Sequence, residues 1–404
     1  MDIKIRWNRH RILKSGLPDA HDAGVRQGIR NVITTPILTV NAGSSSIRLD
    51  AFTIAEAGRI EQVAQLRREL DSGEAADVVR QFVREHSLSG IALVAHRVVH
   101  GGERLQHPCL IDAGVEAEIE RLAPLAPLHN PVALQWICAC RAVLGSAVKQ
   151  VAVFDTAYYA RLPELARLYA LPAEMTQRLH LRRYGFHGLA HEAMWRRWRE
   201  RHSGAATGQR VISLQLGAGC SITAADGDGV KDTSMGFSPL EGLVMATRSG
   251  DIDAGLITWL QQRENLSPRE TERLLNDDSG LLGVSGLSAD MRDLLASGEP
   301  GARRAVALYC YRIRKYIGAY IAVLGGVDAV LVGGGVGENS PEIRARIFEN
   351  MDWAGIRLDP AANAAGTGNE QCISRADSRA QIWVIPVDEA RVLAREALSA
   401  THGP

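Results

Sequence analysis

The chain has 404 residues, of which 46% are hydrophobic and 23% are charged, and its 46 basic side chains balance 46 acidic ones. This length exceeds one ordinary hydrophobic core and predicts two domains. The zero formal net charge argues against a general nucleic-acid-binding protein, which carries a basic excess, although local arginines can still bind a small anion.

Cysteine usage and hydropathy favour a cytoplasmic protein without a membrane segment. Six cysteines without zinc-type spacing in so long a chain do not build a disulfide scaffold, so we expect reduced thiols. No apolar run approaches the roughly 20 residues that a membrane helix requires. Residues 1–33 are basic but lack an apolar centre, which predicts a poorly ordered extension rather than a secretory signal; a transit peptide is the weaker alternative.

Three short apolar segments each run into a turn rich in Gly and Ser. Residues 36–40 precede 41–46, residues 211–216 precede 217–221, and residues 328–332 precede 333–340. The first two turns both continue as Ser-Ile, which hints at two halves built alike. Any single turn is equally compatible with an ordinary tight turn.

Helical and strand patterns alternate between these turns. In residues 303–324 an apolar side chain recurs every four positions, at Tyr309, Ile313, Ile317 and Ile321. Residues 149–155 form another strand candidate, which ends in Asp155. The alternation predicts an α/β fold with helices on both faces of its sheets. Ligands of such sheets bind beyond the carboxyl ends of the strands, where Asn41, Asp155 and Gly333 fall.

No P-loop is present, and in the turn after Val332 the sixth position is Glu338 rather than the third glycine of a dinucleotide fingerprint. A phosphate would therefore be bound by backbone N–H groups and hydroxyls. Asn41, Ser44, Ser46 and Arg48 supply one amide, two hydroxyls and one cation on a short segment. The alternative is a polar hairpin with Arg48 in solvent.

Arg97 and Val99 follow the apolar residues 91–94 and would share one face of a strand. A guanidinium beside an apolar wall suits a small carboxylate, although Arg97 taken alone is more simply interpreted as a surface arginine. Residues 122–131 contain three prolines, so we expect no regular structure there, and this loop offers Leu128 and His129.

Residues 182–188 place Phe186 and His187 between glycines after two arginines. Residues 232–253 present Arg248 among four acidic side chains, and their Gly, Ser and Thr content is typical of a binding surface. Such cationic and hydrogen-bonding groups suit phosphoryl transfer. Asp155 and Glu389 are the carboxylates expected at a magnesium site; alternatively, Glu389 is an acid at a helix N-terminus.

These residues occur in ordered motifs that resemble the acetate/propionate kinase family of the sugar kinase–Hsp70–actin superfamily. The motifs are Asn-Ala-Gly-Ser-Ser-Ser at 41, His-Arg-Val-Val-His-Gly-Gly at 96, Ala-Pro-Leu-His-Asn-Pro at 126, Phe-Asp-Thr-Ala at 154, Arg-Tyr-Gly-Phe-His-Gly at 183, the run 232–253, Gly-Leu-Leu-Gly-Val-Ser-Gly at 280 and Gly-Val-Gly-Glu-Asn-Ser at 335. The resemblance extends from about residue 37 to about residue 397.

The resemblance implies an acetate kinase, which transfers a phosphoryl group from ATP to acetate with Mg²⁺ (or Mn²⁺) and acts as a homodimer. It implies two actin-like, ribonuclease H-like domains with a nucleotide and substrate cleft between them. We expect the N-terminal domain to comprise residues 34–157 and 390–404, and the nucleotide-binding domain to comprise residues 158–389.

The resemblance also assigns residue roles. It makes Asp155, His187, Arg248 and Arg97 catalytic, and Asn41 and Glu389 metal-binding. The acyl substrate would contact Arg97, Val99, Leu128, His129, Phe186 and Pro239. The nucleotide would contact Ser44, Ser46, Arg48, Gln215, Leu216, Gly217, Ala218, Gly219, Asp290, Met291, Arg292, Gly335, Val336, Gly337, Glu338 and Asn339. Because acetate is already ionised, we expect Asp155 to position Mg²⁺ or the acceptor rather than to act as a base.

The chain departs from the family pattern near the phosphates. Arg48 replaces a lysine, and Gln215 and Ala218 replace a histidine and an asparagine. Each lost donor costs about 1–3 kcal/mol if a buried partner goes unpaired. Two alternatives therefore remain open beside an acetate kinase: a kinase for propionate or another short acid, and a nucleotide-binding regulator with reduced catalysis.

Overall fold

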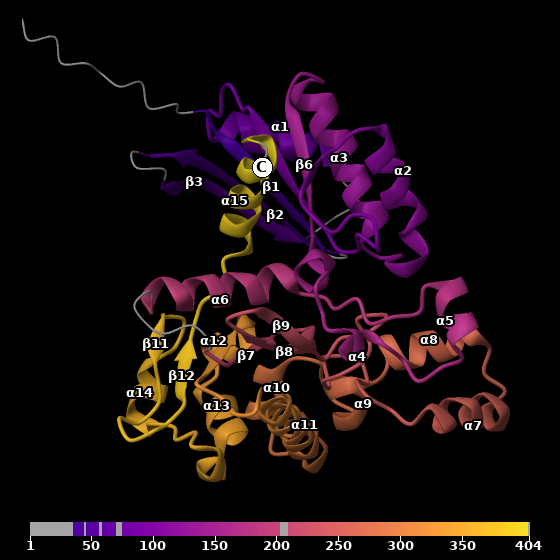
Figure 1. Ribbon diagram of the computed structural model, residues 1–404, viewed down its shortest axis with the longest axis vertical. Coiled ribbons are helices and arrows are strands. Elements are labelled where there is room, and N and C mark those ends of the chain that lie inside the picture. Colours follow the sequence, from indigo (N-terminus) through magenta and orange to yellow (C-terminus); the bar gives the residue numbers. More distant parts are fainter. Residues whose placement is uncertain (1–34, 44–45, 56–58, 70–74, 203–208, 403–404) are drawn as a thin grey trace, which may run out of the picture.

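The computed structural model describes residues 35–43, 46–55, 59–69, 75–202 and 209–402. The predicted extension 1–33 and Ser44 lie outside these described residues. Two mixed β-sheets, one from each half of the chain, lie one above the other, and helix α6 (Gly188–Arg201) runs between them (Figure 1).

The first sheet has the strand order β3-β2-β1-β4-β6-β5. Strands β1, β2 and β3 pair antiparallel, β1, β4 and β6 run parallel, and β5 pairs antiparallel with β6. The bounds are β1 (Ile37–Ala42), β2 (Ser46–Ile54), β3 (Ile60–Glu69), β4 (Leu93–Val98), β5 (Cys109–Leu110) and β6 (Lys149–Phe154).

The second sheet repeats this order, as β9-β8-β7-β10-β12-β11. Strands β7, β8 and β9 pair antiparallel, β7, β10 and β12 run parallel, and β11 closes the sheet antiparallel to β12. The bounds are β7 (Val211–Leu216), β8 (Cys220–Asp226), β9 (Gly229–Thr233), β10 (Ala329–Gly333), β11 (Gln371–Cys372) and β12 (Gln381–Val384). The predicted α/β fold with two halves built alike is confirmed.

Helices cover the first sheet on both faces. One face packs against α1 and α3, with Phe82 and Trp136 buried against strand residues such as Val40 and Leu49. Strands covered on both sides need apolar residues at successive positions, which is why β1 and β4 are short, nearly continuous apolar runs. The helical segments of this half are α1 (Ala75–Glu85), α2 (Ala113–Arg121), η2 (Ala123–Leu125), α3 (Asn130–Leu144) and η3 (Asp155–Tyr159).

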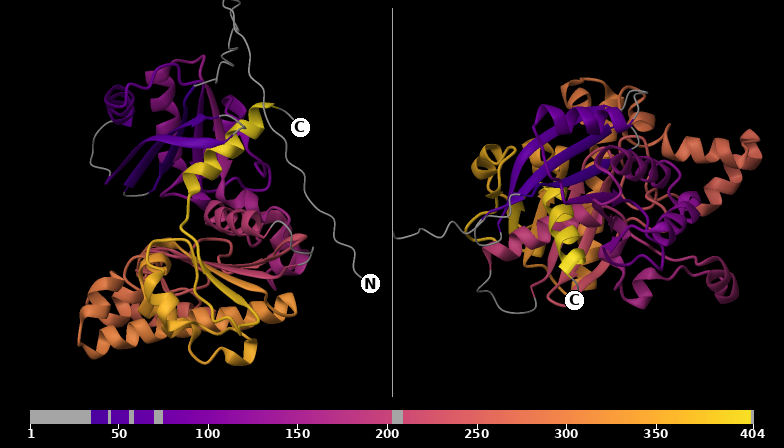
Figure 2. Two further views of the ribbon diagram at one scale, coloured as in Figure 1. Left: turned by 90° about the vertical axis from the view of Figure 1, so that its left-hand side faces the viewer. Right: turned by 90° about the horizontal axis from the view of Figure 1, so that it is seen from above.

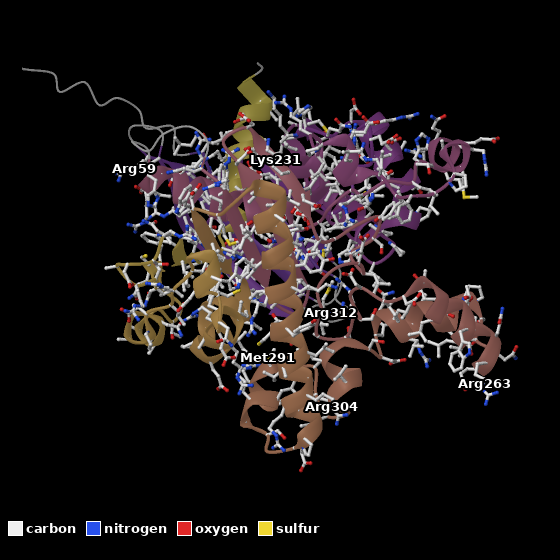
Figure 3. All side chains as sticks on the ribbon, turned by 60° about the horizontal axis from the view of Figure 1, so that its bottom comes forward. Arg59, Lys231, Arg263, Met291, Arg304 and Arg312 are labelled. Atoms are coloured by element: carbon white, nitrogen blue, oxygen red, sulfur yellow. The ribbon has the colours of Figure 1, made fainter. Side chains whose placement is uncertain are left out.

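The long helix α11 (Pro300–Leu324) covers the second sheet, as its periodicity predicted. Tyr309, Ile313 and Ile317 are buried in the core, and Ile321 packs against it. The helix ends at Gly325, whose left-handed backbone suits a glycine. Helices α7 (Ala254–Glu264) and α8 (Pro268–Asn276) project from this half (Figure 1), with Arg263 at the outer end of α7 (Figure 3).

The remaining helices of the second half have at most 11 residues. They are α4 (Glu164–Arg167), α5 (Ala173–Leu179), α7 (Ala254–Glu264), α8 (Pro268–Asn276), α9 (Gly280–Ser285), α10 (Met291–Ala296), α12 (Gly334–Asn339), α13 (Pro341–Phe348), η4 (Asp352–Ala354) and α14 (Pro360–Ala365). None of the helices in the described ranges has the length and apolar character needed to span a bilayer.

The last helix, α15 (Glu389–His402), returns to the first sheet after the second sheet is complete (Figure 2). Its residues Val392, Leu393 and Ala397 join the cluster formed by β1, β4 and β6, and Ala193 of α6 belongs to the same cluster. The other face of α6 packs on the second sheet through Met194 and Trp198. Helices α6 and α15 therefore connect the two halves. The predicted boundary between residues 157 and 158 falls within η3, and the division into domains stays a prediction.

Two local predictions are wrong. Residues 122–131 are not irregular throughout, because η2 forms at Ala123–Leu125 and Pro131 stands in the first turn of α3. Proline is favoured there because its missing N–H has no intrahelical partner in any case. Residues 333–340 are not a simple turn, because they form α12, whose N-cap residue is Gly333.

Candidate active site

Four predicted side chains meet at the carboxyl ends of the parallel strands of the first sheet. Arg97 near the end of β4 donates to Asp155, with 2.6 Å between Nη2 and Oδ2 and 3.2 Å from Nε to each carboxylate oxygen. Its Nη1 donates to Asn41 Oδ1 at 3.0 Å and lies 3.6 Å from Glu389 Oε2. Asn41 Nδ2 in turn donates to Glu389 Oε2 at 2.6 Å. The network joins β1, β4, the end of β6 and the start of α15.

Burial gives this network its electrostatic character. The Asp155 side chain is 1% exposed, and burial raises the pKa of its carboxyl group, while the charge and hydrogen bonds of Arg97 oppose the rise. Burial alone would lower the pKa of Arg97, but Asp155 and Glu389 raise it above its usual value. The guanidinium is therefore permanently charged, and its orientation is fixed before any ligand binds.

His187 lies at the start of α6, in the left-handed backbone region with φ 57°. Burial lowers the pKa of its imidazole well below the usual value, and the charge of Arg97, the neighbouring His191 and the charge of Arg248 act in the same direction. The same causes, burial followed by Arg97 and Arg248, lower the pKa of His129 to about 4. The charges of both arginines therefore act on both histidines.

Gly219, in the turn between β7 and β8, marks the point where His187 and Arg248 come together. A Cβ added to Gly219 would stand 3.2 Å from Nε2 of His187 and 3.5 Å from Nη1 of Arg248. A side chain there would crowd both groups. The two halves of the molecule thus bring Arg97, Asp155, His187 and Arg248 into one site, as the sequence predicts.

Arg248 differs from Arg97 because it has no carboxylate partner. Within the described residues it makes no ion pair; its Nη1 donates to the carbonyl of Pro239 at 3.3 Å, and burial lowers its pKa. The loop that carries it is anchored by Ala246 N–H, which donates to Ala218 O at 3.0 Å. Gly280, with φ +61°, packs so closely on the Arg248 backbone that a Cβ would clash. A half-buried guanidinium without a counter-ion among the described residues favours the binding of an anion.

The acidic residues around Arg248 have structural roles instead. Glu241 binds Arg183 at 2.6 Å, and Asp251 accepts from Gly242 N–H and Tyr316. Asp253 is the N-cap residue of α7.

The predicted acyl-binding residues are only partly gathered. Val99 and Phe186 are buried in one apolar cluster, although Val99 stands one residue beyond the end of β4. Pro239 touches Arg248 through its carbonyl. Leu128 is 60% exposed, so it reaches the substrate only if the substrate or a closing movement covers it.

The predicted nucleotide-binding residues fall into three groups. Gly217 and Gly219 form the tight turn after Leu216, closed by a 3.2 Å hydrogen bond from Gly217 N to Gly219 O. Gly335 faces open space in the first turn of α12. Glu338 accepts from Gly334 N–H and Val387 N–H, and Asn339 donates to the carbonyl of Gly335, so both side chains hold α12 in place.

The third group is formed by Asp290, Met291 and Arg292. Arg292 binds its neighbour Asp290, lowering the pKa of that carboxyl to about 2, and both side chains are exposed. Met291, labelled in Figure 3, is buried in the core of the second half.

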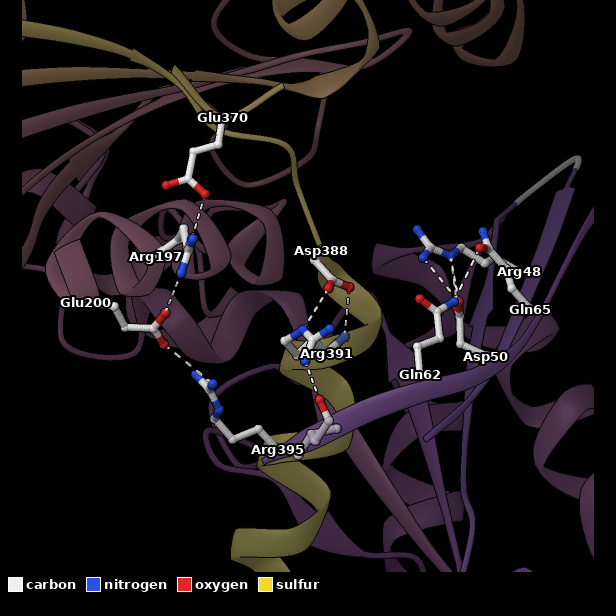
Figure 4. Close-up of polar contacts among 11 residues, drawn as sticks. Arg48, Asp50, Gln62, Gln65, Arg197, Glu200, Glu370, Asp388, Arg391 and Arg395 are labelled. Carbon is white, nitrogen blue, oxygen red and sulfur yellow. Dashed lines mark hydrogen bonds and ion pairs between the residues drawn. The ribbon is translucent and has the colours of Figure 1, made fainter. Parts of the chain in front are cut away.

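The remaining predicted nucleotide-binding residues lie elsewhere in the fold. Arg48 is paired with the buried Asp50 (Nε–Oδ2 2.9 Å; Figure 4) on the strand beside Asn41, and Ser46 starts that strand. Val336 packs against the core, and Gly337 is buried.

Gln215 leaves an unpaired acceptor at the position where the family pattern has a histidine. Its Oε1 is buried and has no hydrogen-bond partner among the described residues. A buried unpaired acceptor is uncommon in native structures. The consequence predicted from the sequence, a less complete set of donors near the phosphates, stays a prediction.

The sequence reasoning missed four residues that support the site. Ser213, Ser221 and His191 form a hydrogen-bonded chain behind His187. Arg344 is fully buried and donates to the carbonyls of Gly337 and Glu338 at the end of α12. The spacing of His191, four residues after His187 on one helix face, was the available signal.

A Mg²⁺ ion fits the donor set if the nucleotide supplies most of its ligands. Within the described residues, no group of three or more His, Cys, Asp or Glu side chains could hold a metal ion by itself. Glu389 Oε2 is engaged by Asn41, and no hydrogen bond involves its Oε1 within the described residues. Magnesium usually takes one or two protein carboxylates together with water and phosphate oxygens. Glu389, with Asn41 and Asp155 beside it, provides this kind of partial site.

The chain is similar to known proteins over most of its length. Residues 60–395 match the model of the acetokinase family. An acetate kinase of Solibacter usitatus is 47% identical over 321 residues, 78% of each chain, and one of Bacteroides thetaiotaomicron is 42% identical over 395 residues, 90% of this chain and 98% of that one.

Solved structures extend the agreement to the whole fold. The acetate kinase of Porphyromonas gingivalis superposes with a TM-score of 0.82 at 34% identity, covering 91% of this chain and 100% of that one. A propionate kinase of Francisella tularensis gives 0.80 at 32% identity, over 90% and 99% of the two chains. The chain belongs to the acetokinase family.

Proposed function

We propose that the chain transfers the γ-phosphoryl group of ATP reversibly to acetate, giving acetyl phosphate and ADP. The observation that carries the proposal is the meeting of a paired arginine and an unpaired one at a single site. Arg97 is held by Asp155, while Arg248 stands beside His187 and has no carboxylate partner in the part of the chain that the structure describes. Two cations and a donor around one space suit the union of a carboxylate with a phosphoryl group.

In this reaction a carboxylate oxygen of acetate forms a bond to the γ-phosphorus. The bond from that phosphorus to the bridging oxygen breaks, and its electron pair stays on ADP. Arg97 orients the carboxylate, and Arg248 and His187 donate to the phosphoryl oxygens as charge spreads over them. Asp155 fixes Arg97 and the acceptor, and no general base is needed because acetate is ionised.

Mg²⁺, bound with the nucleotide, would supply positive charge against the phosphates. Glu389 and Asn41 would hold it from the protein side, and Mn²⁺ would fit the same oxygen donors. Their hydrogen bond to each other and their contacts with Arg97 keep both side chains in place.

Acetate is the first choice of acyl substrate because Val99 and Phe186, both buried in one apolar cluster, suit a small alkyl group. One additional methylene changes binding by only about 1 kcal/mol, so propionate should be tolerated. The structural likeness to the Francisella propionate kinase supports this second substrate.

A hydroxamate assay for acyl phosphate tests the proposal. The intact protein is incubated with ATP and Mg²⁺, and with acetate, propionate or butyrate in turn. We expect product with acetate, less with propionate and least with butyrate. ATP binding without product from any acid would overturn the proposal and favour a nucleotide-binding regulator, the role that Gln215 and Ala218 suggest.

We also propose a cytoplasmic homodimer. Six free cysteines support a reducing compartment. The exposed apolar side chains of the segment that contains α4 and α5 support an association surface, because a monomer rarely exposes so many together; they are Leu165, Leu168, Leu171, Met175 and Leu179. Sedimentation of the intact protein, and of a Leu168→Glu variant expected to dissociate, tests this proposal.

A further inference from the structure

A chain of four side chains connects the second sheet to His187. Ser213 Oγ on β7 lies 2.7 Å from Nδ1 of His191, and Nε2 of His191 lies 2.8 Å from Ser221 Oγ on β8. Ser221 Oγ lies 2.9 Å from Nδ1 of His187. Ser213, Ser221 and His191 are all buried. Within the described residues, neither serine hydroxyl has another hydrogen-bond partner.

Burial favours the neutral form of both histidines in this hydrogen-bonded chain. Burial lowers the pKa of His191 to about 3 and that of His187 well below its usual value. A neutral imidazole carries one N–H and one acceptor nitrogen, and a serine hydroxyl has one hydrogen to donate. The four groups can therefore be arranged in only a few ways.

One arrangement leaves no buried hydrogen without an acceptor. In it, Ser213 donates to Nδ1 of His191, His191 donates from Nε2 to Ser221, and Ser221 donates to Nδ1 of His187. If instead His191 donated to Ser213, the Ser213 hydrogen would have no acceptor. If Nδ1 of His187 and Nε2 of His191 both donated to Ser221, the hydroxyl hydrogen of Ser221 would have no acceptor. Buried donors without acceptors are unfavourable.

The favoured arrangement places the proton of His187 on Nε2. That nitrogen lies beside Gly219, near Nη1 of Arg248, and makes no hydrogen bond within the described residues. A phosphoryl group offers only acceptor oxygens, so it can be bound by this tautomer and not by the other. The opposite tautomer would present a lone pair to the phosphoryl oxygens and repel them.

We propose that Ser213, His191 and Ser221 are positioning residues that hold His187 as the Nε2–H tautomer, so that an uncharged imidazole donates a hydrogen bond to the transferring phosphoryl group. The inference rests on the proposed function for its phosphoryl ligand, but the tautomer itself is a property of the free protein. The two can therefore be tested separately.

The tautomer is measured by long-range ¹H–¹⁵N correlation on the intact protein labelled at histidine nitrogens. A His187→Asn variant identifies the His187 signals. We expect an unprotonated Nδ1 and a protonated Nε2 for both His187 and His191. A protonated Nδ1 on His187 would overturn the inference. Failure of the proposed function would instead appear as absent acyl phosphate formation beside the expected tautomer.

Substitution of Ser213 tests the donor-to-acceptor direction of the hydrogen bonds that lead to His187. In Ser213→Ala, either orientation leaves one His191 nitrogen unpaired, so the two tautomers of His187 become comparable in population. If half of the molecules lack the Nε2 donor, kcat falls about twofold or more, while KM for acetate is unchanged. Ser213→Thr restores the hydroxyl and should restore both the signal and kcat.

The matched control is Thr223→Val. Thr223 lies two residues beyond Ser221 on β8, and its buried hydroxyl bonds Tyr159 and Thr233 without touching either histidine. This control should lose some stability but keep the His187 signal. An unchanged His187 tautomer in Ser213→Ala would contradict the proposal that Ser213 helps to select this tautomer.

Discussion

The two arginines of the site differ in their hydrogen-bond and ion-pair partners. Arg97 donates from Nε and Nη2 to Asp155 and from Nη1 to Asn41, and Glu389 lies nearby. Such a pairing fixes geometry before substrate arrives. Arg248 has no such carboxylate partner among the described residues, so in the proposed reaction an incoming anion would supply its first counter-charge.

Asp155→Asn should abolish turnover while leaving acetate affinity nearly intact. The amide keeps the shape of the carboxylate but loses its charge, so Arg97 is held less firmly, with Glu389 alone opposing its charge. We expect kcat to fall by about 10²-fold or more and the dissociation constant for acetate to change little. Steady-state kinetics and direct acetate binding measure the two quantities.

If Asp155 acted as a base, activity would instead be recovered at higher pH in the variant. A pH profile of Asp155→Asn that shows such recovery would contradict the positioning role.

At the scale of elements, the first turn of α12 contains one glycine that the fold requires and one that faces open space. Gly334 has φ +79°, and a Cβ there would stand 2.6 Å from the carbonyl of Leu216, whereas a Cβ on Gly335 would meet nothing. Gly334→Ala should therefore lower the free energy of unfolding by about 1–3 kcal/mol. Gly335→Ala should fold normally and raise KM for ATP, because the added methyl occupies the space that the nucleotide would use.

Thermal unfolding and steady-state kinetics on this pair of variants provide the check. A Gly335→Ala protein with unchanged KM for ATP would remove α12 from the nucleotide site.

Local patterns predicted the elements well where one signal dominated. The strands β7 and β10 and the helix α11 follow from short apolar runs and a four-residue period. The segment 122–131 was misjudged because proline breaks a helix interior but favours its first turn, and sequence alone did not locate that turn at Pro131. The segment 333–340 was misjudged because its glycines permit either a turn or a helix.

The motifs predicted the residues of the candidate site, but they did not predict the hydrogen bonds that join these residues. The motifs indicated Arg97, Asp155, His187 and Arg248 individually. The bidentate pairing of Arg97 with Asp155 joins residues 58 positions apart, and it depends on the parallel neighbours β4 and β6. The chain through Ser213 and Ser221 depends on the pairing of β7 with β8, which no local pattern specifies.

At the scale of the whole molecule, buried neutral histidines make stability depend on pH. Burial lowers the pKa of His96 and His100 to about 4 and that of His191 to about 3. In the unfolded chain these groups titrate near pH 6.5, so between about pH 7 and pH 5.5 the unfolded state binds more protons than the folded state. The free energy of unfolding should therefore fall as pH falls through this range.

The slope should approach about 1.4 kcal/mol per pH unit for each such histidine. Urea unfolding at several pH values measures it. A free energy of unfolding that stayed constant or increased toward pH 5.5 would show that these imidazoles are not held neutral.

The two similar sheets place the predicted catalytic groups on opposite sides of one site. Arg97 and Asp155 come from the first sheet, and Arg248 comes from the loops of the second. His187 stands at the start of α6, which packs on both halves. A reaction that needs all four groups therefore requires the two halves to be held together.

The most direct test measures acetyl phosphate formation by the intact protein and by Arg248→Ala, with thermal unfolding as the control for folding. We predict turnover of acetate by the natural sequence and a loss of about 10²-fold or more in kcat for the variant, with similar melting temperatures. Absence of acyl phosphate with the natural sequence, or full activity of a folded Arg248→Ala protein, would contradict the account.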